Sequence, residues 1–380
     1  MNSYTIHDLI PVICTEQIQP NRRPITYNNK TLRKYIHTIK KEIDNCLIEW
    51  EKNKRRLNPY EYINTSFDPF SPCVCTYKPI SRAFFKLLEI MNTHSFSFPS
   101  VMKSFHLAEG PGGFIEAIQY TRKNPKDTYY GMTLMDQKKD VPLWNKCERS
   151  IMRNNHNIII ESGDGTGDLY HLENLLHVKK HYEQAMDFIT ADGGFDYSVD
   201  FNNQEESSLH LIFSEICFAV MMQKKGGYFV LKVFDTFSSA TIEMIYFLTY
   251  LYEDVTIMKP MTSRPANSEK YVVCSHFKQV SNLEEIKQRI CDIYIELQKN
   301  PFVSFLNLEM PNVFLNKIRE INSIFGQSQV STILSVLTYI TDEKKNEKTE
   351  QLRKSHIHKC VKWCKKNNME IHDKYDGYYT

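Results

Sequence analysis

The chain has 380 residues, a formal net charge of +2 and 42% hydrophobic residues, which leaves room for one large domain with extensions or for two domains. The near-neutral charge excludes a global field that would hold the protein on nucleic acid, so any contact with a polyanion must come from local clusters. Ten scattered cysteines, no run of about 18 apolar residues and no signal-peptide pattern over residues 1–11 lead us to expect a cytoplasmic protein with reduced thiols and no membrane partner.

The N-terminal part is expected to be an extended arm followed by a helix. Residues 1–28 contain three prolines and no clear period, whereas apolar residues recur at helical spacing over residues 31–56. The other faces of that helix are rich in lysine and arginine, which is typical either of a solvated face or of a surface that contacts RNA. Residues 57–80 predict a packed loop, and Ser81 is a candidate N-cap for a helix that runs to about residue 92.

Strand and helix patterns alternate from about residue 80 to residue 278. This alternation predicts a Rossmann-like α/β fold with a mostly parallel sheet covered on both faces, and an antiparallel last strand, because residues 254–258 and 270–274 leave no room for a crossover helix between them. From residue 281 the pattern is helical, with an irregular stretch over 301–314 and a flexible charged connector over 342–354. We therefore divide the chain into an N-terminal arm and helix (1–57), an α/β domain (58–278) and a helical C-terminal extension (279–380).

A glycine-rich turn follows the first strand of this domain. Its sequence is Glu109-Gly110-Pro111-Gly112-Gly113-Phe114, and a helix pattern over residues 113–122 follows at once. Glycine lets the backbone approach a bound ligand closely. The turn lacks both the G-x-G-x-x-G spacing and the Gly-Lys-Ser/Thr of a Walker A loop, so it suits a ligand without a pyrophosphate, such as S-adenosylmethionine. The alternative is a plain strand–helix turn.

Five further residues are candidates for chemistry. Ligands of open α/β sheets lie beyond the carboxyl ends of the strands, where Asp164 and Asp192 fall. Asp164 lies in a glycine-rich loop and is a candidate acceptor for a ribose or an adenine amine, unless it only shapes an Asp-Gly turn. Lys86, Lys232 and Glu269 join Asp192 in a set of two lysines and two acids. A lysine can act as a base if burial or a second lysine lowers its pKa, and the alternative is a structural ion-pair network.

Two groups of cysteine and histidine were considered as metal sites. Cys73 and Cys75 form a C-x-C pair without two further ligands nearby. His356, Cys360 and Cys364 would share one face of a helix, and His358 lies beside them, but Val361 and Trp363 favour a packed amphipathic helix. We therefore expect no bound metal.

The motifs together resemble a known family. They are Ala108-Glu109-Gly110-Pro111-Gly112-Gly113-Phe114, Gly131-Met132-Thr133-Leu134, Gly165-Thr166-Gly167-Asp168, Ala191-Asp192-Gly193-Gly194-Phe195, Gly227-Tyr228-Phe229-Val230-Leu231-Lys232 and Thr262-Ser263-Arg264-Pro265-Ala266-Asn267-Ser268-Glu269 with Tyr271-Val272-Val273-Cys274. In this order they resemble FtsJ/RrmJ-type S-adenosylmethionine-dependent RNA 2′-O-ribose methyltransferases over residues 58–278. The last motif is similar to the branch that methylates mRNA caps, and the chain also resembles the version of large cytoplasmic DNA viruses (African swine fever virus type), which would place it in the host cytoplasm or virion.

The resemblance implies roles for particular residues. It assigns Lys86, Asp192, Lys232 and Glu269 to a catalytic tetrad in which Lys232 takes the proton of the ribose 2′-hydroxyl. It implies that S-adenosylmethionine is the cofactor. The cofactor would contact the turn, Asp164 and Asp192; the turn residues are Glu109, Gly110, Pro111, Gly112, Gly113 and Phe114. Arg264 and Asn267, next to Glu269, are candidates for contact with RNA.

The implied substrate is the first transcribed nucleotide of capped mRNA, with other capping enzymes as candidate partners. Methylation of rRNA or tRNA, and a catalytically silent RNA-binding subunit, are the alternatives.

Overall fold

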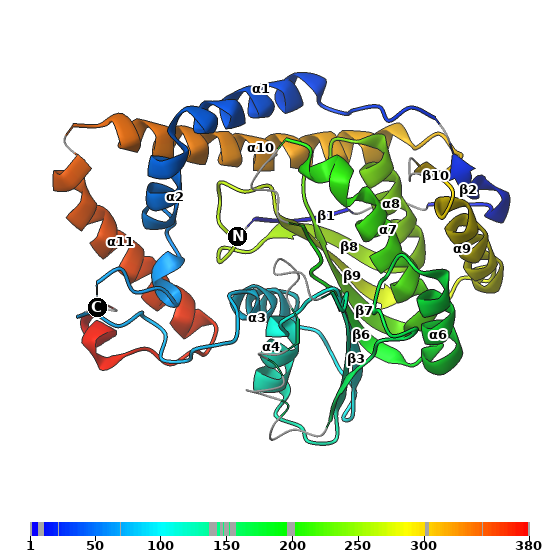
Figure 1. Cartoon of the computed structure of the whole chain (residues 1–380). Coiled ribbons are helices and arrows are strands. Elements are labelled where there is room, and N and C mark those ends of the chain that lie inside the picture. The colour runs from blue at the N-terminus through cyan, green and yellow to red at the C-terminus, as the bar shows by residue number, and fades with distance from the viewer. Residues whose placement is uncertain are drawn as a thin grey trace.

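The computed structural model describes residues 2–6, 11–21, 23–68, 70–136, 157–195, 202–300, 304–343 and 345–378, together with residues 143, 144, 147 and 152. Eight of the strands in these ranges form one sheet at the centre of the protein, in the order β1-β8-β9-β7-β6-β3-β4-β5 (Figure 1). They are β1 (Asn2–Thr5), β3 (Lys103–Leu107), β4 (Thr128–Met132), β5 (Ile158–Ile160), β6 (Met186–Ala191), β7 (Gln223–Val233), β8 (Tyr252–Lys259) and β9 (Lys270–Phe277).

The strand directions confirm the expected fold class. Strands β7, β6, β3, β4 and β5 are parallel, and β9 is antiparallel to both β7 and β8. The sheet has one strand that the sequence did not predict, because β1 from the N-terminal arm pairs antiparallel with β8, with Tyr4 opposite Ile257. A strand of four residues is too short to show a periodic pattern, so only its partner reveals it.

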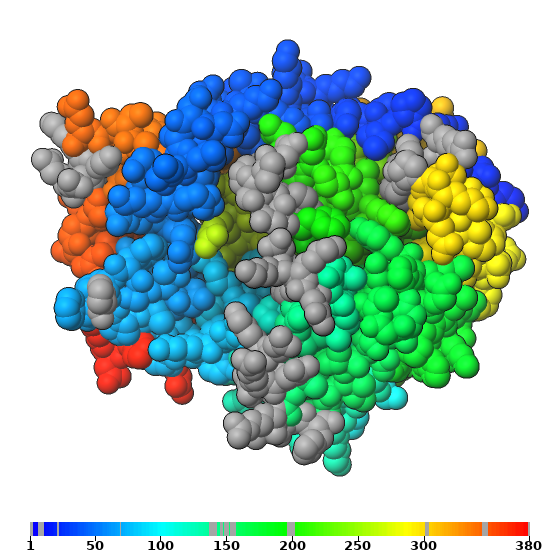
Figure 2. All heavy atoms as spheres, viewed as in Figure 1, coloured from blue at the N-terminus to red at the C-terminus, as the bar shows by residue number. Residues whose placement is uncertain are grey.

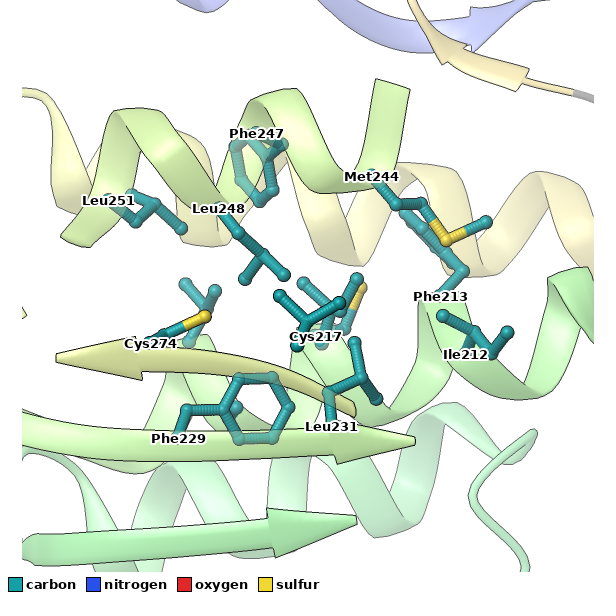
Figure 3. Packing of buried hydrophobic residues seen from close by; sticks show 14 of the residues in the cluster. Ile212, Phe213, Cys217, Phe229, Leu231, Met244, Phe247, Leu248, Leu251 and Cys274 are labelled. Atoms are coloured by element: carbon teal, nitrogen blue, oxygen red, sulfur yellow. The ribbon is translucent and has the colours of Figure 1, made fainter. Parts of the chain in front are cut away.

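Helices cover both faces of the sheet. These helices are α3 (Ala83–His94), α4 (Gly113–Arg122), α6 (Leu172–Tyr182), α7 (Gln204–Met222), α8 (Ser239–Leu251) and α9 (Leu283–Leu297). One apolar core contains α6, α7, α8 and α9 and the sheet residues Phe229 and Leu231, and Figure 3 shows side chains of α7 and α8 meeting that face. The opposite face packs Phe188 and Val230 against α3 and α4. This three-layer arrangement leaves the carboxyl ends of the parallel strands as the natural place for a ligand.

The predicted helix over residues 31–56 is broken into three pieces. They are α1 (Lys30–Lys41), the 3₁₀ helix η2 (Glu42–Cys46) and α2 (Leu47–Arg56). Ile36 packs with Val330 of the C-terminal extension, whereas Trp50, beyond the break, packs with Ile333 and Val336. The change of direction at η2 therefore keeps both pieces packed on the same long helix, α10 (Asn312–Thr341).

The C-terminal extension is more ordered than its sequence predicted. Within the irregular stretch, β10 (Ser304–Leu306) pairs with β2 (Ile18–Asn21). The prediction of a flexible connector over residues 342–354 is wrong, because helix α11 begins within this stretch and covers Lys345–Lys366. The apolar face of α11 packs against α3, and i,i+3 ion pairs such as Arg353–Glu350 suit its exposed face. The described ranges also contain the short helices η1 (Thr15–Gln17), η3 (Glu61–Ile63) and η5 (Asp373–Tyr378). None of the helices in the described ranges is long and apolar enough to cross a membrane.

Candidate active site

The glycine-rich turn lies between the end of β3 and the start of α4, as its sequence predicts. The Gly112 N–H donates to the Glu109 carbonyl oxygen at 2.9 Å, and Gly112 has a φ of +102°, which favours glycine. A Cβ on Gly113 would lie 2.2 Å from Ser81 Oγ, so this glycine allows α4 to start close to the beginning of α3. Ser81 is not the N-cap that we predicted: α3 begins at Ala83, and no described group hydrogen-bonds the buried Ser81 hydroxyl.

Two of the predicted cofactor residues have buried side chains at this turn. Glu109 is buried, with Oε1 2.8 Å from His106 Nδ1 and Oε2 accepting a hydrogen bond from the Thr190 hydroxyl at 3.3 Å. Burial, together with the charge of Asp192, raises the pKa of Glu109 well above its ordinary value. Phe114 is fully buried, 6.1 Å from the Tyr271 ring, so any contact of Phe114 with a cofactor would come from its backbone.

The four residues of the predicted tetrad lie together beside this turn. Lys86 Nζ is 2.8 Å from Glu269 Oε2. Lys232 Nζ donates to the Asp192 backbone oxygen at 2.6 Å and is 3.4 Å from Asp192 Oδ1. Asp192 follows β6, its N–H donates to the Leu107 carbonyl at 3.3 Å, and this contact joins the tetrad to the strand that leads into the turn. Residues from four separate segments thus converge at one edge of the sheet.

The charges of these groups are strongly coupled. Burial alone would lower the pKa of Lys232, but the carboxylates of Asp192 and Glu269 outweigh burial and raise it above its ordinary value. Burial would raise the pKa of Glu269, but Lys86 and Lys232 hold it well below its usual range. The condition that burial or a second lysine lowers the pKa of a lysine base is therefore not met at Lys232, because the carboxylates act more strongly than burial.

Four further residues support the tetrad and were missed by sequence reasoning. Three of them bond it directly: the Tyr271 hydroxyl donates to Asp192 Oδ1 at 2.8 Å, the Ser263 hydroxyl donates to Glu269 Oε1 at 2.7 Å, and Lys259 Nζ donates to the Glu269 backbone oxygen at 2.7 Å. Tyr271 lies directly opposite Lys232 in the β7–β9 register, which no local pattern in the sequence reveals.

The fourth is Glu215, a fully buried residue of α7 beneath the turn that follows Asp192. Its Oε1 accepts the Gly193 N–H at 3.0 Å, and burial raises its pKa to about 8. The available signal in the sequence was a carboxyl inside the mostly apolar stretch 211–222 of this helix, because burying an acid costs free energy unless it has partners.

Asp164 organises its own loop. Its Oδ1 accepts the Thr166 N–H at 2.9 Å and the Asn174 amide at 3.0 Å, and its Oδ2 lies 2.7 Å from His171 Nδ1. Hydrogen bonds, first of all from the Thr166 hydroxyl, lower the pKa of Asp164. Asp164 and His171 also line a cavity of about 560 Å³ beside α7, so one side of the loop remains open to a ligand.

Arg264 and Asn267, the candidate RNA contacts, form hydrogen bonds with other residues of the protein. Arg264 makes a two-pronged contact with the fully buried Glu61, from Nε to Oε2 at 3.2 Å and from Nη2 to Oε1 at 3.0 Å. Asn267 Oδ1 accepts from Lys259 Nζ at 2.7 Å. Both side chains are at least partly exposed in the loop between β8 and β9. In Figure 2, yellow-green atoms are set back between the blue N-terminal helices and the green of α7.

The two cysteine groups come together in space. Cys75 and Cys364 share a side-chain hydrogen bond, and both are buried together with Cys73 and Cys360. Cys360 Sγ donates to the Pro59 carbonyl oxygen at 3.3 Å. Across the residues that the structure describes, no three histidine, cysteine, aspartate or glutamate side chains are arranged to hold a metal ion.

The fold and this site define a class of protein: a Rossmann-like α/β chain with a glycine-rich turn beside a cluster of lysines and acids. The FtsJ-like methyltransferase family model matches residues 79–277, which is more than half of the chain. The chain therefore belongs to the FtsJ-like methyltransferase family.

Curated relatives carry the names of cap methyltransferases. The cap-specific mRNA (nucleoside-2′-O-)-methyltransferase 2 of Danio rerio is 28% identical over 303 residues, which cover 72% of this chain and 39% of that protein. The cap-specific mRNA (nucleoside-2′-O-)-methyltransferase 1 of Mus musculus is 30% identical over 254 residues, which cover 63% of this chain and 30% of that protein. This chain thus spans less than half the length of these relatives.

A Plasmodium falciparum structure described as a ribosomal RNA methyltransferase is 21% identical, with a TM-score of 0.38, over 52% of this chain and 97% of that one.

Proposed function

We propose that this protein transfers a methyl group from S-adenosylmethionine to the ribose 2′-hydroxyl of the first transcribed nucleotide of capped mRNA. The observation that carries the proposal is the convergence of Lys86, Asp192, Lys232 and Glu269 beside the Glu109–Gly113 turn. The names of the curated relatives support the choice of a capped RNA as substrate.

The turn fits S-adenosylmethionine as the cofactor. Glycines leave its backbone open to close approach, and the buried, unpartnered Ser81 hydroxyl beside Gly113 offers a polar group there. The backbone of Gly110–Gly113 and the carboxylate of Asp192 would hold the cofactor, with the Asp164 loop as the candidate for its adenosine end. When bound, S-adenosylmethionine would supply the methyl group on a positively charged sulfur, and a positive charge there would favour the neutral form of Lys232.

Within this proposal, Lys232 is the base that takes the proton of the 2′-hydroxyl. Lys232 Nζ donates a hydrogen bond to the Asp192 backbone oxygen. This bond would restrict the direction of the nitrogen lone pair when the amine is neutral. Lys86 and Glu269 form an ion pair that orients Glu269 toward Lys232 and offers a second amine to the sugar. Most of the rate acceleration would come from holding the hydroxyl in line with the methyl group.

The alternatives are separated by the choice of RNA. Purified protein would be incubated with labelled S-adenosylmethionine and with capped RNA, matched uncapped RNA, rRNA or tRNA. The proposal expects methyl transfer only to the capped RNA, at the 2′-oxygen of the first nucleotide, and loss of transfer with Lys232→Ala. Equal rates on capped and uncapped RNA would remove the cap assignment, and cofactor binding without any transfer would favour the silent RNA-binding subunit.

We also propose the division of the chain into residues 1–57, 58–278 and 279–380, with the middle part as the methyltransferase domain. The two ends pack on that domain, since β1 joins its sheet and α11 joins one of its cores. A cytoplasmic location, other capping enzymes as partners and a relation to the viral version of the family stay predictions.

A further inference from the structure

The connection between β8 and β9, residues 260–269, carries Glu269, and half of its residues are buried. Thr262, Ser263 and Glu269 are each less than a tenth exposed. Inside the loop the Ser263 N–H donates to the Pro260 oxygen at 3.0 Å and the Asn267 N–H donates to the Arg264 oxygen at 3.2 Å. A buried loop needs partners for the rest of its polar backbone groups. Two of those partners lead to the C-terminal extension.

The first partner is Glu89, a buried residue of α3. Glu89 is three residues after Lys86, so the two side chains lie on the same side of the helix. Glu89 Oε1 accepts the Met261 N–H at 2.7 Å, and Oε2 accepts the Thr262 N–H at 3.2 Å and the Thr262 hydroxyl at 3.1 Å. Helix α3 therefore holds the loop at its beginning through Glu89 and at its end through the Lys86–Glu269 pair.

The carboxylate of Glu89 has a fourth donor from α11. Trp363 Nε1 donates to Glu89 Oε2 at 2.9 Å, and Trp363 is 3% exposed. Its ring meets Phe85 edge-on, with the ring centres 5.8 Å apart. Trp363 thus fixes the rotamer of the carboxylate that holds Met261 and Thr262.

The second partner is Gln329 of α10. Gln329 is buried, and its Nε2 donates to the Ala266 carbonyl oxygen at 3.1 Å. Ala266 also packs on the apolar cluster of Trp50, Ile333 and Val336 that joins α2 to α10. The middle of the loop is therefore held by the same long helix that organises the N-terminal helices.

We propose that Trp363, acting through Glu89, and Gln329 are positioning residues that hold the β8–β9 loop so that Glu269 faces Lys86 and Lys232. The C-terminal extension is then part of the active site, although neither residue contacts the tetrad. The inference rests on the proposed function for its effect on the rate, whereas its effect on the loop can be measured without any substrate.

The test uses three full-length variants. Trp363→Phe removes the N–H donor and keeps an aromatic ring against Phe85, and Gln329→Leu removes the bond to Ala266. Tyr375→Phe is the matched control, because it removes a 2.6 Å hydrogen bond from the C-terminal extension to the Pro72 carbonyl oxygen, keeps the aromatic ring and touches no residue of 260–269. Hydrogen exchange followed by mass spectrometry reports the loop in each protein, and steady-state kinetics report kcat and KM.

We expect amide exchange in residues 260–269 to rise about tenfold in both test variants, the effect of one lost hydrogen bond, and to stay unchanged in the control. We expect kcat to fall about fivefold or more with the KM for S-adenosylmethionine unchanged. The value of kcat is expressed per cofactor-binding site counted by titration, so that a loss of folded protein does not enter it.

Unchanged exchange in the loop would overturn the inference, and so would faster exchange with wild-type kcat. If wild-type protein transfers no methyl group to any RNA, the proposed function fails, and the exchange data still decide whether the extension holds the loop.

Discussion

The charge on Asp192 sets the proton affinity of Lys232, and Asp192→Asn tests this directly. The variant removes one negative charge and keeps the shape of the side chain. Lys232 should stay in place, because its shortest bond, 2.6 Å, is to the Asp192 backbone oxygen, and the asparagine oxygen can still accept from Tyr271. The substitution therefore isolates the ion pair between Lys232 Nζ and Asp192 Oδ1 at 3.4 Å.

The size of the effect follows from that distance. Two unit charges 3.4 Å apart attract each other by about 5 kcal/mol at an effective dielectric constant of about 20, and both side chains are only slightly exposed, at 11% and 12%. Because Asp192 raises the pKa of Lys232, its removal must lower that pKa. One pH unit corresponds to about 1.4 kcal/mol, so even a fraction of this energy is measurable.

The assay is the pH dependence of kcat for methyl transfer to capped RNA. A base must be neutral to act, so the rate falls on the acid side of the pKa of Lys232. We expect the acid limb of Asp192→Asn to lie at least about one pH unit lower than that of the wild type, with a lower plateau because a less basic amine takes the proton less readily. An acid limb that does not move, or that moves to higher pH, would refute the reasoning.

Three further predictions follow from single contacts. Gly194→Ala places a Cβ 3.1 Å from Lys232 Nζ, so kcat should fall about tenfold while the melting temperature changes little; a wild-type kcat would contradict this. The hydrogen bond to Asp164 raises the pKa of His171, so its stabilisation is present below about pH 6.5 and is lost as pH rises through the raised pKa. Thermal unfolding should therefore separate His171→Ala from the wild type more at about pH 5.5 than at about pH 9. Burial raises the pKa of Glu215 to about 8, so the folded protein loses stability relative to Glu215→Gln as pH rises toward 8, by about 5 kcal/mol at most. The same pH dependence of the free energy of unfolding in both proteins would refute this prediction.

The sequence predicts the α/β fold well because the signals of its strands and helices are local. Each parallel strand is an apolar run, and each helix has its own period, so alternation alone predicts the mostly parallel sheet that the structure confirms. The elements that it missed depend on distant partners. Strand β1 exists because β8 offers an open edge, and α11 forms because its apolar face meets α3. The bend at η2 depends on packing against α10 in the same way.

The site shows the same division. The positions of Asp192 and Lys232 follow from their places at strand ends, and sequence reasoning grouped Lys86 and Glu269 with them. The resemblance to a family then assigned a role to each of the four. Tyr271 could not be found, because its role depends on the β7–β9 register. The direction in which the Lys232 pKa shifts could not be predicted from the sequence either, since it depends on how closely the carboxylates approach the amine. Local patterns therefore predict which residues reach the edge of the sheet, and only the structure gives their mutual contacts.

The central claim is that Lys232 is the base of a ribose 2′-O-methyl transfer at this edge of the sheet. The most direct measurement is a mass map of the methylated nucleotide in capped RNA after incubation with labelled S-adenosylmethionine and either wild-type protein or Lys232→Ala. We expect one methyl group on the 2′-oxygen of the first transcribed nucleotide with the wild type, and none with the variant, which should still bind the cofactor. Full methyl transfer by Lys232→Ala, or a methyl group on a base instead of a ribose, would contradict the account.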